Sequence, residues 1–422
     1  MLRGYNLKKM SGVFVTEHKK PELLAPAGDM ERLKFAYAYG ADACYVGGES
    51  FSLRAGAGNF SLNELQDGIM LARKLKKKLY VAVNIFAHNA DLPLLKKYLQ
   101  ELSVLSPHGL IVSDPGVFAF CREYAPNLPL HISTQANNTN WSTARFWREQ
   151  GASRIVLARE LSIVEAAEVT VEGGLETEVF VHGAMCMSYS GRCLLSSFLV
   201  GRDANQGDCT HPCRWNYRMF EEASRPGEYF ALEEDARGSY IMNSKDLCLL
   251  RLLPELAAAG ISSLKIEGRN KSVYYVANVT RIYRAALDAL FAEKEKYYLR
   301  PEWQEELTKI SHREYTEGFA LGKPNQTAQR YAKGDYLRGY DFCGVVNQIS
   351  DGLLHIEQRN NLRLGDELEI LLPDATNLCL TLARMFDEEG NPIEVAPHPL
   401  QKITVPSDLF FNVPAIIRRR QR

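Results

Sequence analysis

The residues best suited to chemistry lie in one short stretch, HGAMCMSYSGRCLLS, at 182–196. It holds a histidine, two cysteines, a tyrosine and an arginine, and it has neither the alternation of a strand nor the spacing of a helix. Cys209, Cys213 and Cys248 follow, so five of the nine cysteines of the chain fall within 63 residues. Thiols gathered in this way are typical of metal ligands, of a catalytic centre or of buried core positions.

Composition narrows these alternatives. The chain has 422 residues, of which 46% are hydrophobic and 24% charged, with a net charge of −1, as in an ordinary globular protein of two or three domains. The first twenty residues lack the apolar core of a signal peptide, and no apolar run is long enough to span a membrane. We therefore expect a cytoplasmic protein without a membrane partner, in which clustered cysteines are not disulfides.

The elements that must position these residues alternate between strand and helix. Short apolar runs recur at 22–27, 43–48, 79–85, 109–114, 130–135, 154–159, 178–183, 240–244 and 263–269. Helical periodicity lies between them, for example at 30–40, 62–78 and 93–105. Eight or nine strands in this order predict a closed (β/α)₈ TIM-like barrel rather than an open sheet.

In such a barrel the residues after each strand form the active face, and here they are unusually polar. They are Gly47, Gly48, Asn84, Asp114, Gln135, Arg159, Glu160, His182, Asn243, Lys245, Glu267 and Arg269. The alternative for each is a structural role, such as capping the next helix, as we expect of Asp29. Their convergence at one rim favours a functional site.

Between His182 and Tyr240 the barrel pattern is interrupted by a cysteine-rich insertion of weak periodicity. A metal centre would organise such a segment, because thiolate ligands substitute for a hydrophobic core. The spacing of Cys209 and Cys213 suits half of a zinc site, whereas Cys186 and Cys193 are too widely spaced for the usual knuckle. An iron–sulfur cluster tolerates looser spacing, so zinc, iron–sulfur and buried thiols all stay open at this point. Cys44 and Cys121 are expected to be core thiols.

The stretch EVFVHGAMCMSYSGRCLLS resembles the signature of peptidase family U32, which is also described as collagenase-like. ELLAPAGD, GRDANQGDCTHPCRW, NSKDLC, SLKIEGR and REYTEGF agree with the family in the same order, over about residues 21–320. The length of the chain is similar to that of the longer members, which are tRNA uridine hydroxylases. The resemblance thus implies a cytoplasmic tRNA-modifying enzyme that converts the wobble uridine to 5-hydroxyuridine and requires prephenate.

The resemblance also implies a cofactor. Related members that hydroxylate quinone precursors hold a [4Fe-4S] cluster with four cysteines, and their motif falls on Cys186, Cys193, Cys209 and Cys248. Cys213 is the alternate ligand to Cys209. The implied barrel domain covers 21–330, with an N-terminal extension at 1–20 and the cluster-binding insertion at 182–248.

Further roles follow at the expected site. His182, Glu267 and Arg269 are the catalytic candidates, since an imidazole and a guanidinium suit a dicarboxylate cosubstrate. The candidates for contact with tRNA, by phosphate binding or base stacking, are Arg192, Arg214, Tyr189 and Trp215. Each has a structural alternative, such as an ion pair with Glu267 or exclusion of solvent.

Other functions remain as alternatives. A U32-type peptidase would need an activated nucleophile or a metal-bound water, and the sequence has neither a GxSxG elbow nor an HExxH helix. A non-enzymatic alternative is an RNA-binding or assembly module with a structural cluster. A second subunit of the same family is a candidate partner.

From about residue 331 to 422 the pattern changes to short alternating segments separated by turn signals such as Asp351–Gly352. This predicts a small antiparallel β-barrel of five or six strands, similar to the β-barrels of translation factors. The basic run RRRQR at the end is expected to be a loose tail.

Overall fold

The structure is a computed structural model that describes residues 19–53, 58–184, 245–293, 296–322 and 337–421, together with the backbone of short strands between 220 and 244 and at 329–330. The chain forms two compact units. The first contains the residues up to Leu33, 42–270 and 313–335, and the second contains 34–41, 271–312 and 336–422. The expected extension at 1–20 lies almost wholly outside the described residues.

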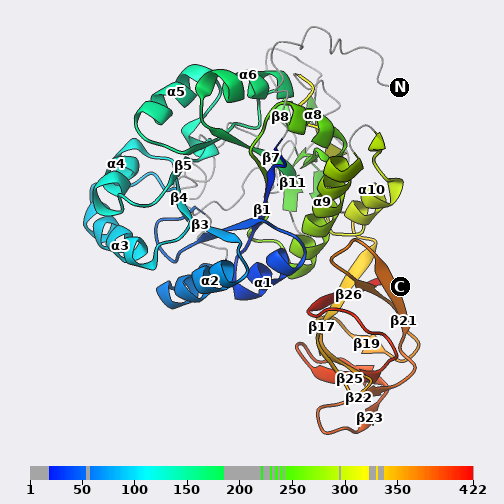
Figure 1. The fold of residues 1–422 in the computed structure, drawn as a ribbon. Coiled ribbons are helices and arrows are strands. Elements are labelled where there is room, and N and C mark those ends of the chain that lie inside the picture. The colour runs from blue at the N-terminus through cyan, green and yellow to red at the C-terminus, as the bar shows by residue number, and fades with distance from the viewer. Residues whose placement is uncertain are drawn as a thin grey trace. The chain divides into compact units, whose positions relative to one another are not determined.

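The first unit is built on eight parallel strands that close into a barrel (Figure 1). They are β1 (Glu22–Pro26), β2 (Ala43–Gly47), β3 (Lys78–Val83), β4 (Gly109–Val112), β5 (Leu130–Ile132), β6 (Arg154–Val156), β7 (Glu176–Ala184) and β14 (Ser263–Ile266). Each strand pairs with the next, and β14 pairs with both β7 and β1. The predicted TIM-like barrel is therefore confirmed.

Helices alternate with these strands. They are α1 (Met30–Ala38), α2 (Leu62–Lys74), α3 (Leu92–Leu105), α4 (Pro115–Tyr124), α5 (Trp141–Glu149), α6 (Ile163–Gly173) and the short α8 (Leu253–Ala258). Ser61 and Ser162 begin α2 and α6 with capping boxes, which satisfy backbone N–H groups that the helix leaves unpaired. Cys44 and Cys121 are fully buried, as predicted, and burial raises the pKa of the Cys121 thiol to about 12.

One predicted strand does not belong to the barrel. Residues 240–244 fall instead on β11 (Gly238–Tyr240) and β12 (Asn243–Ser244), which pair with β10 (Glu233–Asp235) and β16 (Gln329–Arg330) in separate small sheets. A further pair, β8 (Phe220–Glu221) and β9 (Tyr229–Phe230), lies in the same stretch. The apolar run at 240–244 is too short for its pattern to distinguish a barrel strand from a strand of a small hairpin.

Two short strands extend the barrel sheet at its edge beside β7. β13 (Asp246–Cys248) runs antiparallel to β7, and β15 (Tyr315–Thr316) runs parallel to β13. They bring residues from after the insertion, and from a segment far along the chain, to the end of β7.

The second unit contains α9 (Val273–Glu293), α10 (Pro301–Thr308) and an antiparallel β domain. Its main sheet has the order β21 (Asn377–Thr381), β20 (Glu367–Leu371), β26 (Ala415–Arg420), β17 (Tyr340–Ser350), β18 (Leu353–Gln358), β25 (Lys402–Pro406), β22 (Met385–Phe386) and β23 (Pro392–Ile393), and β19 (Leu362–Arg363) pairs with β24 (Val395–Ala396). The antiparallel domain is confirmed, with eight strands in the main sheet rather than five or six. Its apolar core includes Leu354, Ile370 and Ile417.

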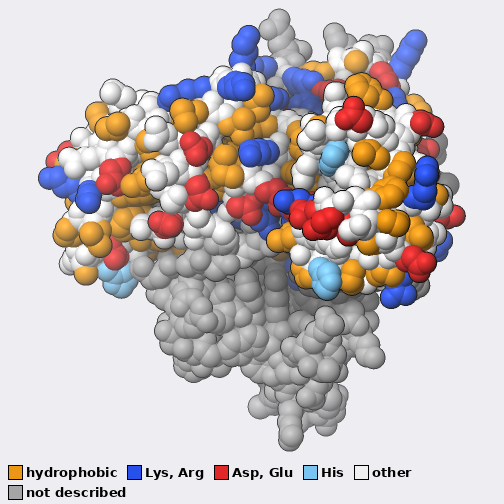
Figure 2. All heavy atoms as spheres, turned by 90° about the horizontal axis from the view of Figure 1, so that it is seen from below, with side chains coloured by type: hydrophobic (Ala, Val, Ile, Leu, Met, Phe, Trp, Pro, Cys, Tyr) orange, Lys and Arg blue, Asp and Glu red, His pale blue; other side chains and the backbone are white. Residues whose placement is uncertain are grey.

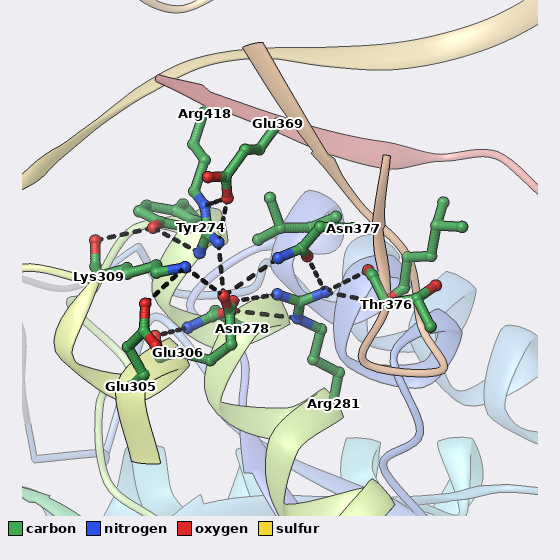
Figure 3. A network of polar contacts seen from close by, with 12 residues as sticks. Tyr274, Asn278, Arg281, Glu305, Glu306, Lys309, Glu369, Thr376, Asn377 and Arg418 are labelled. Carbon is green, nitrogen blue, oxygen red and sulfur yellow. Dashed lines mark hydrogen bonds and ion pairs between the residues drawn. The ribbon is translucent and has the colours of Figure 1, made fainter. Parts of the chain in front are cut away.

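The basic run at the end of the chain is not a loose tail. Arg418 and Arg419 lie in β26, and Arg418 is fully buried. Figure 3 shows its guanidinium between Glu306 of α10 and Glu369 of β20, at 2.8 and 2.5 Å. Arg281 of α9 donates to the other oxygen of Glu306 at 2.5 Å. The run that resembled a solvated tail therefore supplies a buried ionic network to the second unit.

Candidate functional site at the barrel mouth

His182 lies near the end of β7, where its side chain is almost completely buried. Cys248 of β13 is the residue paired with it across the antiparallel ladder. On a third strand, β15, the ring of Tyr315 lies 5.3 Å from the imidazole, with an interplanar angle of 54°. Directly opposite residues of antiparallel strands project to the same face, so a thiol, an imidazole and a phenol meet at this edge of the mouth.

Glu267 follows β14 and is fixed from two sides. Its backbone N–H donates to the carbonyl oxygen of His182 at 2.9 Å, and its carboxylate accepts from Arg159 at 3.1 Å. The Arg159 guanidinium also lies over the Phe180 ring, 3.9 Å from its centroid, and lines a small pocket with Phe180 and Leu247. Two residues predicted independently for the rim, Arg159 and Glu267, therefore form one ion pair.

Arg269 is buried and faces the other side of β14, toward β1 and β2. Its guanidinium donates to the Leu53 carbonyl oxygen, and a Cβ at Gly47 would overlap the same group. A Cβ at Gly28 would meet the Arg269 backbone oxygen. Arg269 thus joins the ends of β1, β2 and β14, which gives it a structural role at the mouth.

Other rim candidates divide between two roles. Asn84 accepts from the Leu53 backbone N–H at 3.1 Å and donates to Gln135 at 3.3 Å, so both line the mouth together. Asp114 caps α4, because its carboxylate accepts a hydrogen bond from the Val117 backbone N–H. This is the structural role that was the alternative for a rim residue. Asp29 accepts from the Arg32 backbone N–H at the start of α1, as expected of a cap.

A network of ion-paired side chains crosses the barrel interior below the mouth. Lys265 of β14 bonds Glu178 of β7 at 2.9 Å, and Arg154 of β6 bonds both Glu178 and Glu22, at 3.1 and 2.7 Å. Since β6 and β1 are not neighbours, this last contact spans the interior. Burial acts to raise the pKa of Glu178, but Lys265 and Arg154 outweigh it and lower that pKa.

These interior charges were not predicted from the sequence, although a signal for them was present. A TIM barrel is usually filled by branched apolar side chains. Arg154, Glu178 and Lys265 stand out as charged residues within the apolar runs RIVLAR, EVFVHG and SLKIEGR. Asp246 lies in NSKDLC, and Arg313 and Tyr315 lie in REYTEGF, but the sequence alone predicted no role for them.

Most of the predicted cluster and tRNA-contact residues lie outside the described residues, namely Cys186, Cys193, Cys209, Cys213, Tyr189, Arg192, Arg214 and Trp215. Within the described ranges, no group of three or more His, Cys, Asp or Glu side chains is arranged to hold a metal ion. Cys248 is partly exposed at the rim. Its sulfur is a suitable donor atom for a cluster. It also lies beside the end of β7, and β7 ends two residues before Cys186, so its position fits a cluster ligand as well.

The face seen in Figure 2 carries acidic and basic side chains interspersed with apolar ones over its described residues. Binding of a polyanion through phosphate contacts alone favours a concentration of Lys and Arg. The described part of this face shows no such stripe. No helix among the described residues is both long and apolar enough to cross a membrane.

The fold and the site define a (β/α)₈-barrel protein with a histidine, a cysteine and two arginines at the carboxyl ends of its strands. The model of peptidase family U32 matches residues 28–330, and that of the family's C-terminal domain matches 338–418. The chain therefore belongs to peptidase family U32.

Three relatives show which members it is similar to. It is 42% identical to tRNA hydroxylation protein P1 of Bacillus subtilis, over 91% of each chain. It is 39% identical to tRNA hydroxylation protein P of Escherichia coli, over 94% of this chain and 97% of the relative. A 23S rRNA 5-hydroxycytidine synthase of Escherichia coli is 34% identical over 66% of this chain and 41% of that protein.

Proposed function

We propose that this protein is a tRNA-modifying enzyme that hydroxylates the wobble uridine to 5-hydroxyuridine, in a prephenate-dependent and iron–sulfur-dependent reaction. The observation that carries the proposal is the pairing of Cys248 with His182 at the mouth of the barrel. The relatives that match this chain over most of their length are named tRNA hydroxylation proteins. The rRNA relative is named for a 5-hydroxylated pyrimidine, which supports the same position on the base.

Cys248 would hold a [4Fe-4S] cluster together with Cys186, Cys193 and Cys209, or with Cys213 in place of Cys209. When bound, such a cluster supplies one-electron transfer. Cys248 fits this role because its thiol lies at the rim rather than in the core, unlike the buried Cys44 and Cys121.

Prephenate carries two carboxylates, for which Arg269 and His182 are the proposed partners. A guanidinium has five N–H donors, so one that bonds the Leu53 carbonyl can also bind a carboxylate. Arg159 supplies a second guanidinium at the mouth, and its pairing with Glu267 fixes the orientation of that carboxylate.

A wobble base must leave its stack to reach this site. Single-stranded loops make extrusion inexpensive, and aromatic side chains receive the extruded base. Tyr189 and Trp215 are the proposed stacking residues, and Arg192 and Arg214 the proposed phosphate partners. A second U32 subunit in the complex is a further part of the proposal.

The peptidase alternative has one observation in its favour, because a cysteine and a histidine are also the components of a thiol nucleophile and its base. Iron content separates the two functions, since a thiolate that ligates iron is not the attacking group. In the assembly-module alternative the cluster is present but no nucleoside changes.

Mass spectrometry of tRNA nucleosides from a deletion strain tests the proposal. We expect 5-hydroxyuridine to disappear in the deletion and to return with the wild-type gene, but not with His182→Ala. Unchanged 5-hydroxyuridine in the deletion would contradict the tRNA function.

A further inference from the structure

Arg313 and Asp246 form a buried ion pair at the edge of the barrel sheet. Asp246 Oδ1 accepts from Nε and Nη2 of Arg313, at 3.1 and 2.7 Å, and Oδ2 accepts from the Arg313 backbone N–H at 3.0 Å. Their side chains are only 5% and 6% exposed. Both carboxylate oxygens are thus held by one residue that lies 67 positions away in the sequence.

This pair lies at the start of β13, the strand that ends at Cys248. Asp246 is paired with Tyr315 across the β13–β15 ladder, and its N–H donates to the Glu314 carbonyl oxygen at 2.9 Å. On the other side of β13, Cys248 is paired with His182. β13 is therefore held between β7 and β15, and Arg313, two residues before β15 begins, bonds Asp246 of β13.

A strand of three residues has few ladder hydrogen bonds to define its register. A one-residue slip of β13 would turn Cys248 to the opposite face of the sheet, away from His182. Replacing a buried ion pair with apolar side chains is often neutral or favourable for stability, and the best-attested benefit of such pairs is specification of one arrangement. An Arg–Asp pair with three hydrogen bonds is suited to fixing the register of β13.

We propose that Arg313 is a positioning residue for the cluster, which acts through Asp246 to hold Cys248 beside His182. This inference rests on the proposed function, because it takes Cys248 to be a cluster ligand. Partners that orient a metal ligand from behind typically change metal affinity by about 10- to 100-fold when they are mutated.

The test compares Arg313→Lys with Arg251→Lys. The first keeps the charge but loses the planar guanidinium that bonds Asp246 through two nitrogens. The second is a matched control in the same region, since Arg251 forms an exposed ion pair with Glu317 at 3.2 Å. Both variants and the wild type are purified anaerobically. Iron per chain, visible absorbance and the rate of iron release to a chelator are measured beside circular dichroism and thermal unfolding.

We expect Arg313→Lys to remain folded and to release iron about 10-fold faster or more, while Arg251→Lys behaves as the wild type. Asp246→Glu, which moves the carboxylate by one methylene, should give the same result and serves as the second variant. Release at the wild-type rate from both Arg313→Lys and Asp246→Glu would overturn the inference. Global unfolding of both would overturn it too, by assigning the pair to fold stability. A wild-type protein without iron would instead refute the cluster of the proposed function.

Discussion

Cys248 and His182 face each other across β13 and β7, at the mouth of the barrel. If Cys248 is a cluster ligand, Cys248→Ser should lose the iron and the visible absorbance of anaerobically purified protein. His182→Ala should keep the iron while hydroxylation falls by about 100-fold or more, as for loss of a proton-transferring or anion-binding group. Stoichiometric zinc without iron in the wild type would contradict this expectation, and full iron in Cys248→Ser would remove Cys248 from the set of ligands.

Cys209 and Cys213 are the two candidates for one position in the proposed set of cluster ligands. The family resemblance predicts that Cys209→Ser loses the cluster and that Cys213→Ser retains most of it. Iron and sulfide analysis of the two variants decides between them, and the reverse result would transfer the ligand role to Cys213.

Arg269 and Gly47 are coupled at the mouth, because a Cβ at Gly47 would overlap the Arg269 guanidinium. Arg269→Lys removes the planar donor, so 5-hydroxyuridine in tRNA should fall at least about 10-fold with iron unchanged. The backbone at Gly47 is outside the left-handed region, so Gly47→Ala should act through the side chains that its Cβ would meet, those of Arg269 and Ser52. The two changes together should be less than additive, as for residues in contact. Additive losses, or normal modification in Arg269→Lys, would separate Arg269 from the site.

Glu306 holds Arg281 and Arg418 in the second unit (Figure 3). Burial acts to raise the pKa of Glu306, but Arg418 and Arg281 outweigh it and lower that pKa from 4.5 to about 2. Glu306→Gln leaves buried guanidinium groups without their carboxylate, which should cost about 3–5 kcal/mol of the free energy of unfolding at pH 7. The stabilisation is present above the unfolded pKa and is lost as the pH falls through the folded pKa.

Urea unfolding of wild type and Glu306→Gln at pH 7 and at about pH 3 measures this effect. The difference between the two proteins should shrink at the lower pH, where protonation begins to remove the charge from the wild-type carboxylate in the unfolded state. A difference that is the same at both values would show that the charge of Glu306 is not the origin of the stabilisation.

Glu178 and Lys265 form a buried pair in the barrel interior, at 2.9 Å. Glu178→Leu alone leaves a buried ammonium without its carboxylate and should cost about 3–5 kcal/mol. Glu178→Leu combined with Lys265→Met should cost less than the sum of the single changes. Unfolding free energies from a double-mutant cycle give the coupling, and a coupling near zero would show that the pair does not act as a unit.

The sequence by itself determined the barrel and part of its mouth. Apolar runs at regular intervals specify eight strands, because each must bury both faces between the interior and the helices. The residues at the carboxyl ends of those runs then meet at one rim, which is why Asn84, Gln135, Arg159, His182 and Glu267 were predictable without coordinates. The family resemblance supplied the proposed cluster ligands, which periodicity alone left open.

Only the tertiary structure decided which of these residues are partners. The approach of Cys248 to His182 depends on β13 returning antiparallel to β7, and the contact of Arg313 with Asp246 joins distant segments. The same holds for Arg418, whose basic run resembled a tail until its pairing with Glu306 was visible. A local sequence pattern indicates whether a segment is a helix or a strand. The partner of a buried charged side chain is decided by the packing of elements that lie far apart in the chain.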